Sequence, residues 1–379
     1  MRNNYDYQIV AIGDVFLQTK SGEHNPFTLE IEEFLKKQRH VLVNLETVLA
    51  DDGVPHQKAI NLKNDRHMSL YMKEVGITLA NVSNNHALDF GAQGLASTVD
   101  AINNAGIDII GLTINGEQKA CILNIDNSIQ VGALAYTVGK KDVGNIGIAQ
   151  LNEKQIIRDI KSLKLNNVDK IMVSLHWGEE YVLYPSPEQQ RLARSLIDNG
   201  VDVIIGHHPH VLQGIEEYKN GIIFYSLGNF NFGGVGYLSN NRPNSKWGMI
   251  VLLNFTKNTN LKYSIIPIKI DNDYRPSFAR KNDKDIILNH IREISAPLIP
   301  KIHTLFWFRE ASVTHFSNHL PSYFKRIKRH GYRHLLLMIR WLLKPKTILY
   351  YIGLCLLAIK KAANFILLKT NKGNSKLKL

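Results

Sequence analysis

Short runs of apolar residues alternate with stretches of helical periodicity through most of the chain. Each run holds four to six apolar residues bounded by Gly, Asn or Asp, which is typical of buried strands, although periodicity alone also allows short buried helices. The runs lie at Gln8–Ile12, Val41–Leu45, Ile77–Val82, Ile107–Leu112, Ile171–Leu175, Val201–Ile205 and Ile222–Tyr225. Strands that alternate with helices predict an α/β domain.

Two further segments have clearly marked ends. The stretch SPEQQRLARSLIDNG offers Ser186 as a cap, Pro187 in the first turn and Gly200 as a stop, so it predicts a helix. Within Met249–Ile270, the apolar stretches MIVLLNF and KYSIIPIKI flank the polar TKNTNL, which predicts a hairpin. We therefore expect a core domain over residues 5–270, a linker and helix over 271–300, and a separate tail over 301–379.

Polar side chains follow five of the predicted strands directly. Because ligands bind beyond the carboxyl ends of the strands in an open α/β sheet, we expect these side chains to share one crevice. Carboxylate, carboxamide and imidazole groups are the ligand set of Zn, Mn or Fe, so the pattern predicts a site for one or two divalent transition-metal ions. The residues are Asp14, Glu46, Asn84, Asn85, His86, Asp89, His176, His207, His208 and His210.

Each of these residues has an ordinary structural interpretation when it is taken alone. Asp14 could cap a helix, Glu46 could pair with a cation, and His86 could lie in a surface turn. These separate structural roles do not explain why all of the residues follow strands that are expected to be adjacent. We expect the neighbouring Glu179 and Glu180 to lie on a solvated face.

Six segments that contain these residues resemble, in the same order, those of CapA-type proteins of bacterial capsule and poly-γ-glutamate synthesis. The segments are GDVFL, NLET, NVSNNHALDFG, SLHWGEEY, GHHPHVLQG and IFYSLGNF, and they cover about residues 8–232. The CapA type is in turn similar to the calcineurin-like metallophosphatases. The resemblance implies an α/β fold in four layers, an α/β/β/α sandwich around two facing sheets, with a metal site between the strand ends.

The resemblance also implies roles for single residues. The positions that match metal ligands are Asp14, Glu46, Asn85, His176, His208 and His210, while His207 is the less favoured ligand. Glu46 stands where the superfamily has a carboxylate that bridges two metals. His86 matches the catalytic histidine that protonates the leaving group, and Asp89 would orient its other ring nitrogen.

The chain departs from the superfamily pattern at two points and from the usual CapA-type protein at a third. The second ligand of the first motif usually stands two residues after the Asp, and here that position is Phe16, which cannot coordinate a metal. The second motif is NLE in place of a Gly-Asp pair. CapA-type proteins usually have an N-terminal membrane anchor, which we do not expect here, because the first residues contain no apolar segment long enough for an anchor or a signal peptide. Because of Phe16 and the NLE motif, one of two metal positions is short of ligands.

The positive charge of the chain is concentrated near its end. The composition, with 44% hydrophobic and 21% charged residues, is that of an ordinary globular protein, and Cys121 and Cys355 indicate no disulfide framework. Of the net charge of +13, the segment from Ala311 to Leu379 supplies fourteen Lys or Arg and no acid, which leaves the body at −1. A nearly neutral body argues against a nucleic-acid partner.

The basic tail also contains the apolar stretches LLLMIRWLL and TILYYIGLCLLAI. We expect a helix pair in the membrane interface that binds an anionic membrane surface, most simply at the cytoplasmic face. A basic helical subdomain packed on the core is an alternative. A transmembrane hairpin is less favoured because Arg340 and Lys344-Pro345-Lys346 leave segments that are too short.

Two functions from different classes remain open. The first is a metal-dependent hydrolase or transferase, phosphoesterase-like, acting in capsule or poly-γ-glutamate biosynthesis. The second is a non-enzymatic, membrane-associated accessory subunit that retains a structural metal and binds other polymer-synthesis subunits. Phe16 favours the second, and the intact NNH and HPH segments favour the first.

Overall fold

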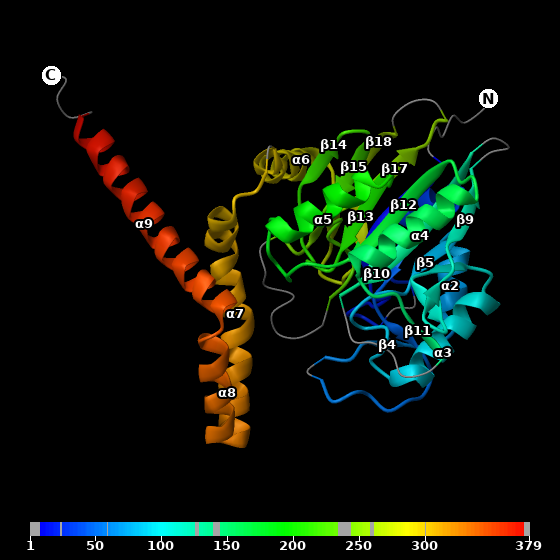
Figure 1. Ribbon diagram of the computed structural model, residues 1–379, viewed down its shortest axis with the longest axis horizontal. Coiled ribbons are helices and arrows are strands. Elements are labelled where there is room, and N and C mark those ends of the chain that lie inside the picture. Colours follow the sequence, from blue (N-terminus) through cyan, green and yellow to red (C-terminus); the bar gives the residue numbers. More distant parts are fainter. Residues whose placement is uncertain are drawn as a thin grey trace. The chain divides into compact units, whose positions relative to one another are not determined.

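The chain divides into two compact units, each of which is described here by itself. The computed structural model describes residues 8–22, 25–58, 60–125, 129–138, 145–233, 244–257, 261–299 and 301–374. An α/β unit comprises Met1–Tyr181 and Glu188–Ile299. A helical unit comprises Val182–Pro187 and Pro300–Leu379. Figure 1 shows the elements of both units in sequence colours.

The α/β unit is built on two facing sheets. In spatial order, the larger sheet contains β19 (Pro276–Phe278), β18 (Lys262–Ile270), β17 (Trp247–Asn254), β1 (Ile9–Val15), β2 (His40–Leu45), β5 (Leu79–Asn81) and β6 (Asp108–Ile110), with β16 (Asn229–Asn231) beside β1. The smaller sheet contains β14 (Ile215–Tyr218), β15 (Gly221–Phe224), β13 (Val203–His207), β12 (Lys170–His176), β10 (Gln130–Thr137) and β9 (Cys121–Asn124).

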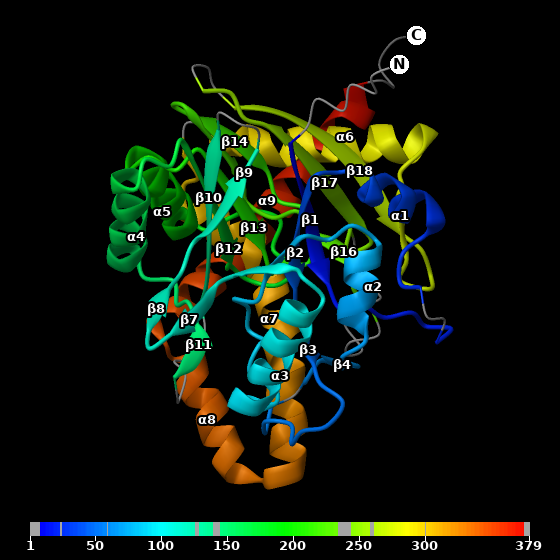
Figure 2. The same cartoon turned by 90° about the vertical axis from the view of Figure 1, so that its right-hand side faces the viewer.

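Helices cover the outer face of each sheet (Figure 2). On the larger sheet lie α1 (Leu29–Lys36) and α2 (Met68–Glu74), and on the smaller sheet lie α4 (Glu153–Leu165) and α5 (Pro187–Asp198). The predicted α/β/β/α sandwich of four layers is therefore confirmed. The remaining elements are α3 (Gly91–Asn104), α6 (Lys281–Ser295), the 3₁₀ turn Ala296–Leu298, and the short strands β3 (Val48–Leu49), β4 (Lys63–Asn64), β7 (Leu112–Ile114), β8 (Glu117–Gln118) and β11 (Ile146–Ile148).

The apolar runs form strands because both faces of each sheet are covered. All seven residues of β1 are buried, and β1, β2, β5 and β6 pair in parallel. The central strands of the smaller sheet, β10, β12, β13 and β15, are parallel as well. A parallel strand between two layers needs apolar side chains on both faces, which gives a continuous run in place of an alternating one.

The segments with marked ends fold as predicted. Helix α5 spans Pro187–Asp198, and Gly200 behind it has a φ of +104°, a conformation that favours glycine. The hairpin consists of β17 and β18, in which Ile250 pairs with Ile266. The segment 271–300, predicted as a linker and a helix, contains β19 paired with β18 as well as α6, and the α/β unit extends to Ile299.

The helical unit contains α7 (Thr304–His330), α8 (Tyr332–Leu342) and α9 (Pro345–Asn374). Its interior is aromatic: the His315 ring stacks on Tyr350 with centroids 3.7 Å apart, and Trp341 lies 5.7 Å from the same ring. Among the residues that the structure describes, no single helix is long and apolar enough to cross a membrane. Taken together, the segments Leu335–Leu342 and Pro345–Ile359 are long and apolar enough for a membrane span, but they are bent by 70° relative to each other.

A buried amide joins the two sheets of the α/β unit. Asn81 on β5 donates its two amide hydrogens to Asn44 Oδ1 and to Ser174 Oγ on β12, both at 3.1 Å, and its Oδ1 accepts the Ser83 N–H at 2.8 Å. Asn81 is completely buried, so water cannot easily replace these three bonds.

We expect Asn81→Ala to lower the free energy of unfolding by at least about 1–3 kcal/mol, because a buried polar group that loses its partner costs about that much and Asn81 has three partners. Urea unfolding followed by circular dichroism in chelator measures the change. The control is Asn104→Ala, the same substitution at an exposed helix end, which should change stability by no more than about 0.5 kcal/mol. Equal effects of the two substitutions would contradict the role given to Asn81.

Candidate metal centre

Strand ends from both sheets bring the predicted ligands together. Asp14 lies at the end of β1, in register with Asn44 on β2, and Glu46 follows β2 directly. On the other sheet, His176 at the end of β12 is in register with His207 at the end of β13. Carboxyl ends of parallel strands meet at one edge of a sheet, so facing sheets present their polar ends to each other.

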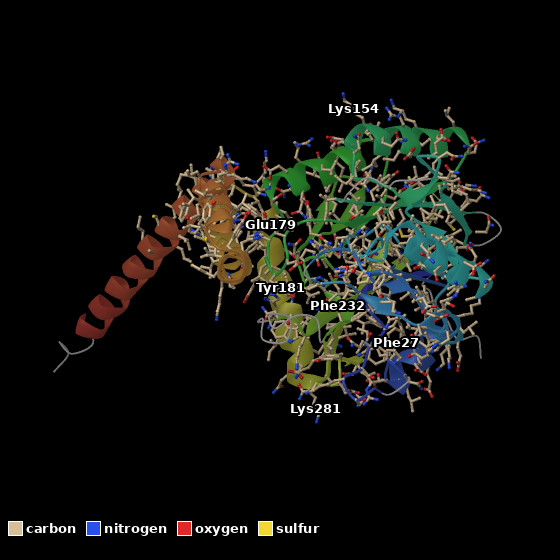
Figure 3. All side chains as sticks on the ribbon, turned by 90° about the horizontal axis from the view of Figure 1, so that it is seen from below. Phe27, Lys154, Glu179, Tyr181, Phe232 and Lys281 are labelled. Carbon is tan, nitrogen blue, oxygen red and sulfur yellow. The ribbon has the colours of Figure 1, made fainter. Side chains whose placement is uncertain are left out.

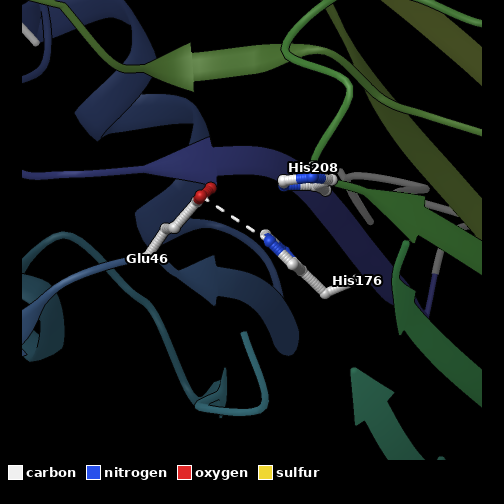
Figure 4. Close-up of side chains that lie close together, drawn as sticks. All are labelled: Glu46, His176 and His208. Carbon is white, nitrogen blue, oxygen red and sulfur yellow. Dashed lines mark ion pairs between the residues drawn. The ribbon is translucent and has the colours of Figure 1, made fainter. Parts of the chain in front are cut away.

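Glu46 is the common member of two groups of candidate ligands. Its side chain is completely buried, and Oε1 lies 3.6 Å from His176 Nε2 and 3.6 Å from His210 Nε2. Glu46, His176 and His208 offer ligand atoms within 4.8 Å of one another, and so do Asp14, Glu46 and His210. Figure 4 shows the first of these groups. The geometry thus contains two overlapping ligand triads that share one carboxylate.

Neither oxygen of Glu46 has a hydrogen-bond donor among the described residues. Burial raises the pKa of Glu46 well above its ordinary value, and His210 lowers it only in part. His208 Nδ1 is also buried without a partner in the described part of the chain. Buried polar atoms are normally paired, so these orphaned ligand atoms are what a cation site requires.

Asp14 has a different environment from Glu46. Its Oδ1 accepts from Asn44 Nδ2 at 2.8 Å, and its Oδ2 accepts the His208 N–H at 3.2 Å. His207 Nδ1 and His210 Nδ1 each lie 3.3 Å from one of its oxygens. Burial alone would raise the pKa of Asp14, but the contacts with His207 and His210 hold it well below its ordinary value. Asp14 is therefore an ionised carboxylate.

The histidines after β13 are held in strained backbone conformations. His208 has a φ of +94° and His210 a φ of +56°, which is uncommon for residues other than glycine. Burial lowers the pKa of His208 to about 4, which leaves a neutral imidazole. Burial also acts to lower the pKa of His210, but Glu46 and Asp14 raise it to about 10. Strain of this kind persists where the surroundings enforce it, which is common at functional sites.

Asn85 and His176 extend the first triad. Asn85 Oδ1 lies 2.9 Å from His176 Nε2, the nitrogen that also faces Glu46. On the other side of the ring, His176 Nδ1 lies 3.2 Å from Asn44 Nδ2. Burial lowers the pKa of His176 well below its ordinary value, so its imidazole is neutral, as a metal ligand must be.

His86 stands beside the ligands with one nitrogen fixed. Its Nδ1 lies 2.7 Å from Asp89 Oδ2, and its Nε2 lies 3.9 Å from Glu46 Oε1. Asp89 is completely buried; it accepts the Leu62 N–H at 2.6 Å and forms an ion pair with Lys58. Burial lowers the pKa of His86, although Asp89 acts in the opposite direction. This arrangement leaves Nε2 as the nitrogen that faces the site.

The structure thus brings the eight residues with predicted roles into one region, together with His207, which the sequence also offered, and Lys58, which it did not. His207 is completely buried against Asp14 and belongs to neither triad, and Lys58 reaches His86 and Asp89 from a loop. Phe16, at the position where the superfamily has a ligand, packs in an apolar cluster with Leu62 and Phe232. Glu180, expected on a solvated face, is exposed but groups with His208 and His210 as a third possible ligand triad.

The family model described as "Bacterial capsule synthesis protein PGA_cap" matches residues 8–234, which include all of the residues above. The chain belongs to this family of bacterial capsule synthesis proteins. Among curated relatives of the family, "Capsule biosynthesis protein CapA" of Bacillus anthracis is 38% identical over 257 residues, which are 61% of this chain and 61% of the relative. "PGA biosynthesis protein CapA" of Bacillus subtilis is 31% identical over 223 residues, 56% of each chain.

The chain spans about three fifths of the length of these two relatives. A third relative of this chain, "Probable polyglutamine synthesis accessory protein" of Mycobacterium tuberculosis, is 24% identical over 273 residues, 67% of this chain and 72% of the relative. The solved calcineurin-like phosphoesterase YfkN of Bacillus subtilis aligns with a TM-score of 0.41 at 15% identity, covering 76% of this chain and 95% of that one. The fold assignment rests on the strand order and on the layers of helices and sheets.

Because the triads overlap at Glu46, we expect substitutions to remove metal in different amounts. His176 belongs to one triad only, so His176→Ala should bind one divalent ion per chain where the unaltered protein binds two. Glu46→Gln should bind neither ion tightly, because both triads lose a carboxylate. Elemental analysis by mass spectrometry after loading with Mn²⁺ and dialysis gives the stoichiometry.

The matched control is His67→Ala, which removes an exposed imidazole of the same unit and should leave the metal content unchanged. Full metal content in Glu46→Gln would rule out a shared carboxylate.

Proposed function

We propose that the α/β unit is a metal-dependent, phosphoesterase-like hydrolase or transferase that acts in capsule or poly-γ-glutamate biosynthesis. One observation carries the proposal: a completely buried Glu46 joins two ligand triads, and His86 Nε2 lies 3.9 Å from it. The names of two curated relatives, which refer to capsule and PGA biosynthesis, support the biological setting.

The donor set suits one or two divalent transition-metal ions such as Mn, Zn or Fe. The residues that would hold them are Asp14, Glu46, Asn85, His176, His208 and His210. A bound divalent ion polarises a phosphoryl or carbonyl oxygen and lowers the pKa of water. The imidazoles and the two carboxylates already lie on or beside rigid strand ends, so little reorganisation of the chain is needed. Because the pKa values of Glu46 and His210 are raised, metal binding would release protons from these two side chains.

The chain itself supplies the proton for the leaving group. Asp89 holds Nδ1 of His86, which fixes the ring and directs Nε2 toward the buried carboxylate. When the bond to the leaving oxygen breaks, Nε2 donates its proton to that oxygen. Burial lowers the pKa of His86, and an anionic substrate beside the ring would favour the protonated form again. Asp89 acts as a positioning residue, itself held by Leu62 and Lys58.

We expect His86→Ala to keep the metal content and the fold while it lowers the rate of phosphodiester hydrolysis by about 10²-fold or more, the usual size of general acid catalysis. The rate on a chromogenic phosphodiester and the metal content are measured on the same preparations. His67→Ala serves as the control and should keep both. An unchanged rate in His86→Ala would contradict the role of His86 as the proton donor.

The second candidate function is a non-enzymatic accessory subunit of a polymer-synthesis complex that retains a structural metal. The apolar packing of Phe16 favours it, because one metal position then lacks a ligand that the superfamily usually has. The printed name of the Mycobacterium tuberculosis relative points to the same class. This function predicts that metal binds and that the unaltered protein shows no hydrolysis above the metal-free control.

We propose further that the helical unit binds the anionic inner surface of the membrane. Large apolar side chains are exposed along α8 and α9: Leu335, Leu336, Leu337, Ile339, Leu343, Ile348, Tyr351, Ile352 and Ile359. Arg340, Lys344 and Lys346 are exposed on the same stretch. Apolar side chains next to Lys and Arg suit a helix that lies in the interface, and each basic residue near an anionic surface adds about 1 kcal/mol.

In vesicle co-sedimentation, the full-length chain should pellet with anionic vesicles more than with neutral ones, and less at high salt. Lys344→Glu/Lys346→Glu should weaken this binding about tenfold or more, because four units of charge change at the surface. The control is Lys154→Glu/Lys161→Glu on α4, which changes the net charge equally in the α/β unit and should leave binding intact. Binding that is equal in the two charge variants would refute the assignment to the helical unit.

A further inference from the structure

Glu180 brings a third carboxylate to the candidate metal centre. It belongs to the loop that follows β12, four residues after His176. Glu180, His208 and His210 offer ligand atoms within 4.8 Å of one another. His208 belongs to the first triad and His210 to the second, so Glu180 lies next to one member of each. Unlike the other carboxylates of the centre, Glu180 is exposed.

Main-chain geometry holds the Glu180 loop against the histidine loop. Tyr181 donates its backbone N–H to the carbonyl oxygen of Pro209 at 2.7 Å, and Pro209 stands between His208 and His210. Tyr181 has a φ of +63°, so the chain adopts an uncommon conformation to make this contact. The rings of Tyr181 and Phe232, both labelled in Figure 3, lie 6.0 Å and 4.5 Å from the His210 ring. The two loops are therefore fixed to each other next to the site.

A second feature fixes where the loop turns. Gly178 has a φ of +95°, and a Cβ atom at this position would lie 2.8 Å from Gln189 Nε2. Glycine therefore lets the chain turn sharply directly after the buried Trp177. The turn places Glu180 beside the histidines, although it follows His176 by only four residues.

The centre has a deficit that a third carboxylate would fill. Phe16 packs against Leu62 and Phe232 where the superfamily has a ligand, so it adds no fourth donor to the triad of Asp14, Glu46 and His210. Two divalent ions carry four positive charges, and Asp14 and Glu46 supply only two negative ones. The unpaired oxygens of the buried Glu46 and the buried, unpaired Nδ1 of His208 point independently to a cation at this place.

We propose that Glu180 is a metal ligand of this chain, the carboxylate that takes over on the His210 side from the ligand missing at Phe16. This inference rests on the proposed function only in that the centre binds divalent metal; it does not require catalysis. Metal binding would draw an exposed side chain onto a partly buried centre, and the loop that carries it is already fixed to Pro209.

The test is Mn²⁺ binding to the full-length chain, followed by the electron paramagnetic resonance signal of free Mn²⁺. The unaltered protein should bind two ions, and Glu180→Gln should weaken one of the two sites by about 10-fold or more, since even residues that only support a ligand are worth 10–100-fold in affinity. Glu180→Asp, which keeps the carboxylate one methylene shorter, should fall between the two.

The matched control is Glu179→Gln, which removes the same charge one residue earlier and should bind Mn²⁺ as the unaltered protein does. Thermal unfolding in chelator checks that all variants are folded. Two tight sites in Glu180→Gln would overturn the assignment of Glu180 and leave the proposed metal centre standing. An unaltered protein that binds no Mn²⁺ would overturn both.

Discussion

The structure of the site depends on one buried carboxylate. Glu46 is completely buried, neither of its oxygens has a donor in the described part of the chain, and imidazole nitrogens of His86, His176 and His210 lie 3.6–3.9 Å from its Oε1. A carboxylate left in this state is costly unless it takes up a proton or a cation compensates it. Two further features are consistent with a bound cation. The pKa of Asp14 is held well below its ordinary value, and His208 and His210 adopt positive φ angles beside it.

The parallel central strands of the two facing sheets position the ligands. Each sheet contributes ligands from the carboxyl ends of its strands, and buried amides connect the two: Asn44 lies between Asp14 and His176, and Asn81 binds Ser174 across the interface. The ligands are therefore positioned by rigid strands, while His86, Lys58 and Glu180 approach from loops. Ligands on rigid strands, with further polar side chains on loops at the rim, suit a site that must hold a cation and still admit a substrate.

Much of this arrangement could be predicted from the sequence, because it depends on local patterns. Apolar runs such as Val201–Ile205 mark strands buried on both faces, and the polar residue behind each strand marks the shared edge. What could not be predicted depends on contacts between segments far apart in sequence. The bond from Tyr181 to Pro209 brings Glu180 to the histidines, and the pairing of β19 with β18 extends the α/β unit to Ile299. No periodicity in the sequence encodes either contact.

The central claim is that Glu46 is shared by two metal positions, and the most direct measurement is a crystal structure of Mn²⁺-loaded protein with an anomalous difference map. The account predicts two anomalous peaks, one near Glu46 and His176 and one near Glu46 and Asp14, each within coordination distance of the Glu46 carboxylate. A map in which Mn²⁺ binds elsewhere, or in which Glu46 stays without any metal contact, would contradict it.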